Sequence, residues 1–212
     1  MARIEAGGLA SPTQVPQRLA LPNLRHDPEG NLMLYQIKNW RAYKDRFLQR
    51  RLSGLNALGG MTTMRAELHA KFIRGDGTER DLGLLSARVV TNAGVTYMRD
   101  DFNAATGAAD ITNFKFNASG TGSVAENVTD TALGTDSGVA RVTGSQGVGA
   151  GSNTYVTVGT MNYVSTLAIT EHGIFSASSA GTLWDRSVFA AINVVSGDAI
   201  QFTYTLTITA GG

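Results

Sequence analysis

The sequence predicts a mainly β protein: an antiparallel β-sandwich or jelly roll with one short helix, preceded by an extended arm and an amphipathic basic helix. Three observations lead to this prediction. Residues 199–209 alternate strictly between apolar and polar side chains, which is the pattern of a half-buried strand. Further short segments of this kind follow residue 61 and are separated by glycine-rich turns. All four prolines lie at or before Pro28, so the first part of the chain has a different character.

Charge divides the chain in the same way. The 212 residues carry a net charge of +1, which argues against nucleic acid as a partner of the whole chain. Residues 1–60 hold nine Lys and Arg against four Asp and Glu, whereas residues 102–212 hold three against seven. We therefore predict two regions: an N-terminal arm plus helix over 1–60, and a β-sandwich domain over 61–212. Cysteine is absent, which excludes disulfides. The sequence has no run of about 18 apolar residues, so we predict no membrane-spanning helix.

The first region combines an extended arm with a helix. Pro12, Pro16, Pro22 and Pro28 fix the backbone and remove donors, so we expect residues 1–31 to be extended. Residues 35–55 carry an apolar stripe at helical spacing, and basic side chains fill the remaining positions. This basic face is either merely solvated or a docking surface for an acidic protein, with nucleic acid or membrane as a further option. The predicted interface residues are Lys38, Trp40, Arg41, Lys44, Arg46, Arg50 and Arg51.

The sequence of the second region predicts a series of strands. Residues 64–72 and 82–90 form a hairpin around a turn at 75–77, and Thr91 or Asn92 caps a short helix. Val95, Met98 and Phe102 are expected on the inner face of this helix. Residues 144–153 are expected to form a glycine-rich loop, and 196–198 a tight turn. The remaining strands are expected at 111–117, 139–143, 155–164, 167–175, 183–189, 192–195 and 199–209.

The sequence predicts no catalytic, metal or cofactor site. Glu171 and His172 are adjacent, so on a strand they face opposite sides and cannot line one pocket without a bulge. The three histidines, His26, His69 and His172, are scattered, and we expect each at the surface or at an interface. We therefore expect a protein that is not an enzyme.

Four residues are predicted to be structural. Arg186 is one of only three basic residues after residue 101, so it should pair with a carboxylate. Glu171 is the better candidate, because the neighbouring Asp185 should face the other side of the strand. Phe202 and Tyr204 lie on the apolar side of the closing strand and are expected in the core.

An ordered set of segments resembles a family of tailed-bacteriophage virion proteins, which occur as capsid decoration or as tail and fibre components. The segments are Phe116-Asn-Ala-Ser-Gly-Thr-Gly122, Asp130-Thr-Ala-Leu133, Thr170-Glu-His-Gly-Ile-Phe175, Arg186-Ser-Val-Phe189 and Gly197-Asp198. The resemblance covers roughly residues 66–209 and leaves the arm outside. It implies a non-enzymatic β-sandwich that serves in virion assembly and has no catalytic residues.

Three functions follow as hypotheses. The first is a capsid decoration, or cement, protein anchored by its N-terminal arm. It would act as a homo-oligomer, with a trimer favoured, in contact with the major capsid protein or other virion proteins, in a virion assembled in the bacterial cytoplasm. The second is a tail, baseplate or fibre component. The third is a carbohydrate-binding or hydrolytic module, for which the sequence offers only the scattered aromatic residues Tyr155, Tyr163 and Trp184.

Overall fold

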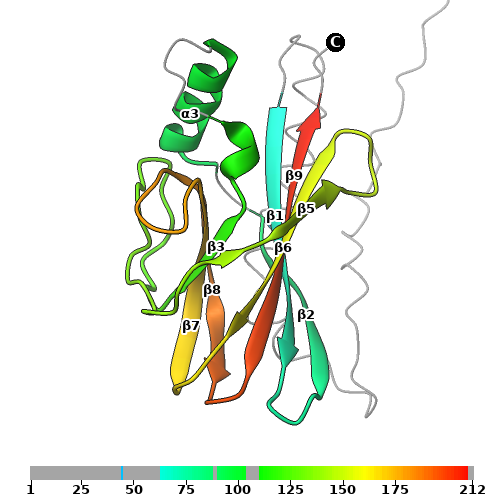
Figure 1. Cartoon of the computed structure of the whole chain (residues 1–212), viewed down its shortest axis with the longest axis vertical. Helices are drawn as coiled ribbons and strands as arrows, with labels where there is room; N and C mark the ends of the chain where they lie inside the picture. The colour runs from blue at the N-terminus through cyan, green and yellow to red at the C-terminus, as the bar shows by residue number, and fades with distance from the viewer. Residues whose placement is uncertain (1–43, 45–62, 88–89, 104–109, 210–212) are drawn as a thin grey trace, which may run out of the picture.

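A computed structural model gives the structure of the chain and describes Lys44 and residues 63–87, 90–103 and 110–209. Two antiparallel sheets pack face to face, and one helix lies at one end (Figure 1). The five-stranded sheet has the order β2-β1-β9-β6-β5 and the four-stranded sheet the order β4-β3-β7-β8. This is the predicted β-sandwich. Its elements are β1 Thr63–Ile73, β2 Glu79–Ser86, α3 Asn92–Asn103, the 3₁₀ helix η1 Ile111–Asn113, β3 Phe116–Gly120, β4 Val142–Thr143, β5 Ser145–Val148, β6 Thr154–Asn162, β7 Leu167–Phe175, β8 Leu183–Val194 and β9 Ala199–Thr209.

The closing strand β9 lies at the centre of the five-stranded sheet. It pairs with β1 from Thr209 opposite Thr63 to Ala199 opposite Ile73, and with β6 on its other side. Its apolar residues from Ile200 to Leu206 are buried, whereas the polar residues between them are half-buried. Phe202 and Tyr204 are fully buried, as the alternation predicted. One face of this sheet therefore supplies half of the core.

The four-stranded sheet is buried on both faces. Residues 117–120, 171–175 and 183–187 are buried without alternation. One face packs on the five-stranded sheet, and residues between β3 and β4 lie over the other (Figure 1). A second apolar cluster forms there, in which Ala118, Phe175 and Leu183 are joined by Leu133 from the covering loop. Alternation fails in these strands because both sides of the backbone meet protein.

Several predicted boundaries are wrong. Residues 145–148, expected as loop, form the short strand β5 beside β6. Residues 111–113 form a 3₁₀ helix, and the strand begins only at Phe116. The two strands expected at 183–189 and 192–195 are one strand, β8, which pairs with β7 through two register shifts. The ladder continues on either side of each shift, so the strand is not interrupted.

Helix α3 presents a face that agrees with the predicted one at Met98 but not at Val95 or Phe102. Thr91 caps it as expected, because its Oγ1 accepts the Gly94 N–H at 3.0 Å. Phe102 is 80% exposed and Val95 42% exposed, whereas Tyr97 and Met98 pack against the core. The cause is Gly94: a Cβ at this position would lie 2.9 Å from the indole of Trp184, so the helix backbone rests on that ring. Among the described residues, no helix has both the length and the apolar content that crossing a membrane requires.

Candidate functional site

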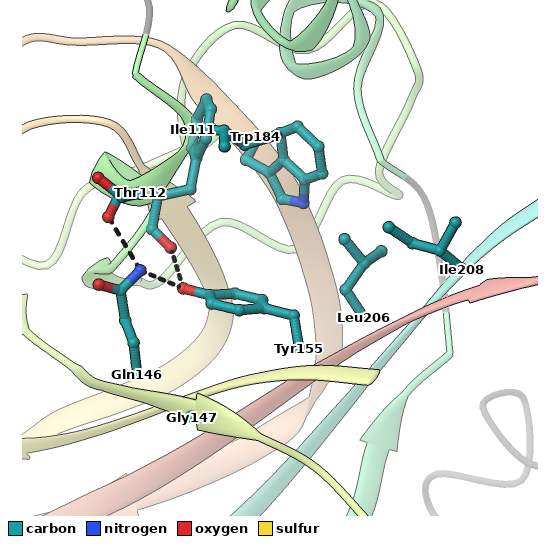
Figure 2. Close-up of a pocket in the computed structure, with 9 residues that line it drawn as sticks. Ile111, Thr112, Gln146, Gly147, Tyr155, Trp184, Leu206 and Ile208 are labelled. Atoms are coloured by element: carbon teal, nitrogen blue, oxygen red, sulfur yellow. Dashed lines mark hydrogen bonds between the residues drawn. The ribbon is translucent and has the colours of Figure 1, made fainter. Parts of the chain in front are cut away.

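An apolar pocket opens at one end of the sandwich, between η1, β5 and the last residues of β9 (Figure 2). Its volume is about 470 Å³, which lies within the range of ligand-binding clefts. Aromatic and aliphatic side chains form most of its wall: Ile111, Phe114, Tyr155, Trp184, Leu206 and Ile208. The sequence singled out Tyr155 and Trp184 as aromatic residues but could not show that four distant segments meet around them.

The polar atoms at the edge of this pocket bind one another. Gln146 Nε2 donates to the carbonyl of Thr112 and to the hydroxyl of Tyr155, each at 2.9 Å. The Tyr155 hydroxyl donates in turn to the carbonyl of Phe114 at 2.8 Å. Trp184 Nε1 donates to the buried hydroxyl of Tyr204 at 2.9 Å. The pocket therefore offers an apolar surface whose neighbouring donors are already engaged.

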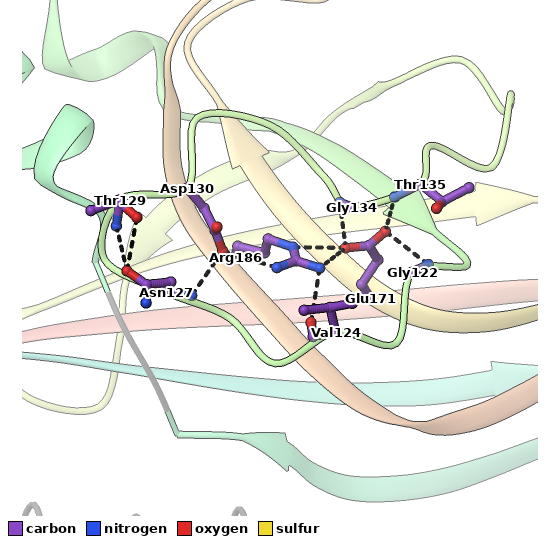
Figure 3. Close-up of polar contacts among 9 residues, drawn as sticks. All are labelled: Gly122, Val124, Asn127, Thr129, Asp130, Gly134, Thr135, Glu171 and Arg186. Carbon is purple, nitrogen blue, oxygen red and sulfur yellow. Dashed lines mark hydrogen bonds and ion pairs between the residues drawn. The ribbon is translucent and has the colours of Figure 1, made fainter.

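A buried carboxylate forms the second candidate site, on the outer face of the four-stranded sheet (Figure 3). Glu171 is 0% exposed, and its two oxygens accept four hydrogen bonds. Oε1 accepts the backbone N–H groups of Gly122 and Thr135 at 2.9 and 2.7 Å. Oε2 accepts the N–H of Gly134 at 2.9 Å and Arg186 Nε at 2.8 Å, and it forms an ion pair with Arg186 NH2 at 2.7 Å. The ion pair predicted between Glu171 and Arg186 is thus present, and it is buried.

Arg186 extends this cluster to the covering loop. Its NH1 lies 2.9 Å from Asp130 Oδ2, and its NH2 donates to the carbonyl of Val124 at 3.1 Å. Burial alone would lower the pKa of Arg186, but the hydrogen bonds to Asp130 and Glu171 outweigh burial and raise the pKa above its ordinary value. The guanidinium is therefore a fixed positive charge that joins two strands to the loop.

Four of the five segments that carry the family resemblance meet in this cluster, whereas Gly197-Asp198 lies in the turn before β9, where Asp198 accepts the N–H groups of Gly75 and Val195. Glu171 comes from one segment, Arg186 from a second, Asp130 from a third and Gly122 from a fourth. A Cβ on Gly122 would lie 2.5 Å from Glu171 Oε1, so the close approach of the loop requires glycine. Leu133, at the end of the Asp130 segment, lies against Gly173, where a Cβ would approach it to 2.9 Å. Contacts in three dimensions thus account for the spacing of these motifs along the chain.

This geometry fits anchoring rather than catalysis. Both oxygens of Glu171 are occupied by donors, and the loop backbone covers them, so they have no open side toward a substrate. The cluster holds residues 122–135 against the sheet. In the described part of the chain, no group of three or more His, Asp or Glu side chains could hold a metal ion.

His172 departs from its prediction as a surface or interface residue. It is 1% exposed and lies between the sheets, with its ring 4.5 Å from the ring of Phe202. Its Nε2 donates to Asn117 Oδ1 at 3.0 Å, and its buried Nδ1 has no hydrogen-bond acceptor among the described residues, which fits a neutral ring protonated at Nε2. Burial lowers the pKa of His172 to about 3. His69, on β1, is half-buried, and His26 lies outside the described residues.

Asp185 is also buried, next to a bulge in β8. Trp184 is the extra residue between the pairs Ile174–Asp185 and Phe175–Leu183. Asp185 accepts the hydroxyl of Ser187 at 3.1 Å, and burial raises the pKa of its carboxyl well above the ordinary value. This carboxyl is part of the packed interior, with Ser187 as a hydrogen-bond partner.

Most of the predicted basic interface lies outside the described residues. These are Lys38, Trp40, Arg41, Arg46, Arg50 and Arg51, whereas Lys44 is helical and exposed. The proposed boundary at residue 60 also lies outside them. No protein-family model matches the chain, and a search of curated proteins finds no match. The function is therefore argued from the residues and their geometry.

Proposed function

We propose that this chain is a non-enzymatic structural protein of a tailed-bacteriophage virion, and specifically a capsid decoration protein anchored by its N-terminal arm. In this proposal the β-sandwich is the body that stands on the shell. The arm and the basic helix contact the major capsid protein or neighbouring subunits, and the protein acts as a homo-oligomer, with a trimer favoured.

One observation carries the proposal. Four of the five motif segments that resemble the virion family contribute to the Glu171–Arg186 cluster, which fastens a long loop over the four-stranded sheet. These residues serve architecture, because their polar atoms are occupied within the protein. A β-sandwich whose long loop is held by buried polar contacts is consistent with a structural role on the capsid surface.

The charge of the first 60 residues supports the anchor. Nine basic residues against four acidic ones favour an acidic protein surface as the partner. An extended, proline-containing segment can also cover a large area on docking, and the entropy of ordering is offset only when the contact forms.

Binding of the full-length chain to emptied capsids of the parent phage tests whether the N-terminal region attaches the protein to the shell. The variant with Arg46→Glu and Arg50→Glu should bind at least roughly tenfold more weakly, because charge attraction to the shell becomes repulsion. The variant with Arg74→Glu and Arg80→Glu makes the same charge change at two exposed positions of the β1–β2 hairpin and should bind like the natural chain. Equal binding by both variants would reject the arm as the anchor.

Whether the protein lies on the head or on the tail of the particle needs a separate measurement. A tagged copy located on purified particles by gold labelling should appear on the head. Label confined to the tail would reject decoration and would favour the tail, baseplate or fibre hypothesis.

The pocket bears on the carbohydrate-binding hypothesis. Sugar hydroxyls need hydrogen-bond partners, and a polar group buried without one costs free energy. At the pocket edge, both N–H groups of Gln146 and the hydroxyl of Tyr155 already have partners within the protein. We therefore expect no binding on a glycan array, and specific binding of one sugar class would revive that hypothesis.

A further inference from the structure

Strand β5 leaves one edge of the five-stranded sheet open. It is the last strand in the sheet order and pairs with β6 alone (Figure 1). All four of its residues, from Ser145 to Val148, are exposed. A strand with an open edge presents backbone N–H and C=O groups to which another strand can bind.

The hydrogen bonds to β6 show which backbone groups of β5 point outward. The Gly149 N–H donates to the carbonyl of Thr154, which lies directly opposite when the β5–β6 register is continued. Because the backbone groups along a strand point alternately to its two sides, Gly147 also binds β6. Gln146 and Val148 therefore point their N–H and C=O groups away from the sheet. In the part of the chain that the structure describes, these four groups make no hydrogen bond.

The other edges of the two sheets carry features that oppose pairing with a second chain, namely charge, irregularity, shortness or a covering element. Edge strand β2 begins with the exposed residues Glu79, Arg80 and Asp81 and has two register shifts against β1. Strand β4 has only two residues, and β8 contacts β2. Strand β5 has no charged residue, no proline and no register shift against β6. Of the described edges, β5 is therefore the one on which another strand fits best.

The open edge is complementary to a second copy of itself. In an antiparallel pair, two opposite residues whose backbone groups point toward each other exchange two hydrogen bonds. If Gln146 of one copy lies opposite Val148 of the other, the reverse pair forms by symmetry, and all four outward groups of each strand are used. This register places Gly147 opposite Gly147 on a two-fold axis. Moving the axis to either neighbouring residue would pair Gln146 or Val148 with a position outside β5.

We propose that β5 docks on β5 of a second copy of this chain, in antiparallel register around a two-fold axis at Gly147. Four backbone hydrogen bonds then join the two five-stranded sheets into one continuous sheet. Hydrogen bonds between exposed strands contribute little net free energy, so the contact is weak and is measured at high protein concentration. The contact involves the β-sandwich alone and depends neither on the virion role nor on the N-terminal arm.

Cysteine pairing tests the register directly, since the natural chain contains no cysteine. Opposite residues that exchange no hydrogen bonds have Cα atoms about 4.5 Å apart, which lies within the range of a disulfide. A Cβ at Gly147 meets nothing within 4 Å, so the fold accommodates a side chain there. Full-length Gly147→Cys protein under mild oxidation should therefore form a disulfide-linked dimer, which is separated without reductant.

Ser145→Cys is the matched control. Ser145 is exposed on the same strand and points to the same side as position 147. In the proposed register, however, the two copies of Ser145 are four residues apart along the strand, or about 13 Å. This distance is too long for a disulfide, so Ser145→Cys protein should give only the yield of random collisions.

A second substitution in the Gly147→Cys protein tests the backbone contact. Val148→Pro removes one outward N–H and leaves the bonds to β6, because proline is tolerated on an edge strand where the N–H faces solvent. The yield of linked dimer should fall to that of Ser145→Cys. Val148→Thr keeps both the N–H and the β-branched shape, so it should keep the yield. Circular dichroism verifies that both proteins are folded.

Charge provides a readout that needs neither oxidation nor proline. Gly147→Lys or Gly147→Glu places like charges opposite each other across the axis, which should weaken self-association by up to about fivefold. An equal mixture of the two variants places opposite charges there and should associate more strongly than either variant alone. Sedimentation equilibrium at high protein concentration measures the association.

Three results would overturn the proposal. The first is a yield of linked dimer for Gly147→Cys no greater than for Ser145→Cys. The second is an equal yield for Val148→Pro and Val148→Thr when both proteins are folded. The third is a mixture of Gly147→Lys and Gly147→Glu that associates no more strongly than the separate variants. None of these results would bear on capsid binding.

Discussion

At the scale of single residues, His172 shows that burial rather than residue type decides charge in this protein. The sequence places a titratable ring beside Glu171, a pattern that can look like an acid–base pair. The strand sends the two side chains to opposite faces, so Glu171 lies under a loop among backbone N–H groups and the guanidinium of Arg186, whereas His172 meets Phe202 between the sheets. One side chain is therefore held in a buried ion pair, and its neighbour is a ring whose pKa is lowered by burial.

Acid should weaken the fold through His172. Its pKa is about 3 when folded and about 6.5 in the unfolded chain, so the unfolded state binds more protons between these values. The free energy of unfolding should fall by about 2 kcal/mol from this group as the pH drops from 7 to 5. Urea unfolding at several pH values measures the slope. In His172→Gln this part of the slope should vanish, and an unchanged slope would assign the effect to other groups.

Phe202 should be one of the most costly side chains to remove. It is 0% exposed and contacts the rings of His172 and Phe189. Phe202→Ala should lower the free energy of unfolding by about 3–5 kcal/mol, because it leaves a cavity. Thr203→Ala, on the outward face of the same strand, should change it by less than about 1 kcal/mol. A loss below about 1 kcal/mol for Phe202→Ala in urea unfolding would contradict its place in the core.

At the scale of elements, two ion pairs of similar length contrast in burial. Arg186 and Glu171 are 2.7 Å apart with side chains 4% and 0% exposed, whereas Lys71 and Glu79 are 2.9 Å apart with side chains 39% and 54% exposed. Arg186→Met should cost about 3–5 kcal/mol, because it leaves Glu171 charged and buried. Lys71→Met should cost less than about 1 kcal/mol. Thermal and urea unfolding of both variants measure the difference, and equal losses would show that Glu171 does not need its partner.

The covering loop should depend on Gly122. A Cβ at this position would meet Glu171 Oε1 at 2.5 Å and the backbone N of Thr135 at 2.9 Å, so Gly122→Ala must push the loop outward. We expect a loss of about 1–3 kcal/mol and faster hydrogen exchange at the amides of Gly134 and Thr135. Gly147→Ala in β5 meets nothing within 4 Å and should be nearly neutral. Unchanged exchange in Gly122→Ala would mean that the loop is held elsewhere.

Sequence patterns predicted strands well where one face of the strand is exposed to solvent and the other is buried. Residues 199–209 match β9 at both ends, and 64–72 falls within β1. Residues 167–175 also match β7 at both ends, although residues 171–175 are covered on both faces. The failures have a shared cause, which is a tertiary contact that no local pattern encodes. Strand β5 consists of Ser-Gln-Gly-Val and is ordered by pairing with β6, and α3 turns its face according to the fit of Gly94 on Trp184.

At the scale of the whole molecule, the two sheets play unequal parts. The five-stranded sheet has one face in the core, so the alternation of apolar and polar residues along β9 was enough to predict that Phe202 and Tyr204 are buried. The four-stranded sheet has two covered faces, and its outer face depends on a long connection whose residues carry little periodicity. The pair of Glu171 and Arg186 could be predicted because charges are scarce in this region. The pocket could not, because its wall combines η1, β5, β6, β8 and β9.

The body should fold without the arm. Among the described residues, the main core cluster runs from Ala66 to Leu206 and joins both sheets. We expect a chain of residues 61–212 to keep the β-rich circular dichroism spectrum and to unfold cooperatively in urea. A chain of residues 74–212 is the matched control, because it also lacks β1, which supplies Leu68 and Phe72 to the core and one neighbour to β9. That loss of buried apolar surface and of a full strand ladder should abolish cooperative unfolding. If the chain of residues 61–212 also unfolds without cooperativity, the first 60 residues belong to the folded body, and the division into arm and body is wrong.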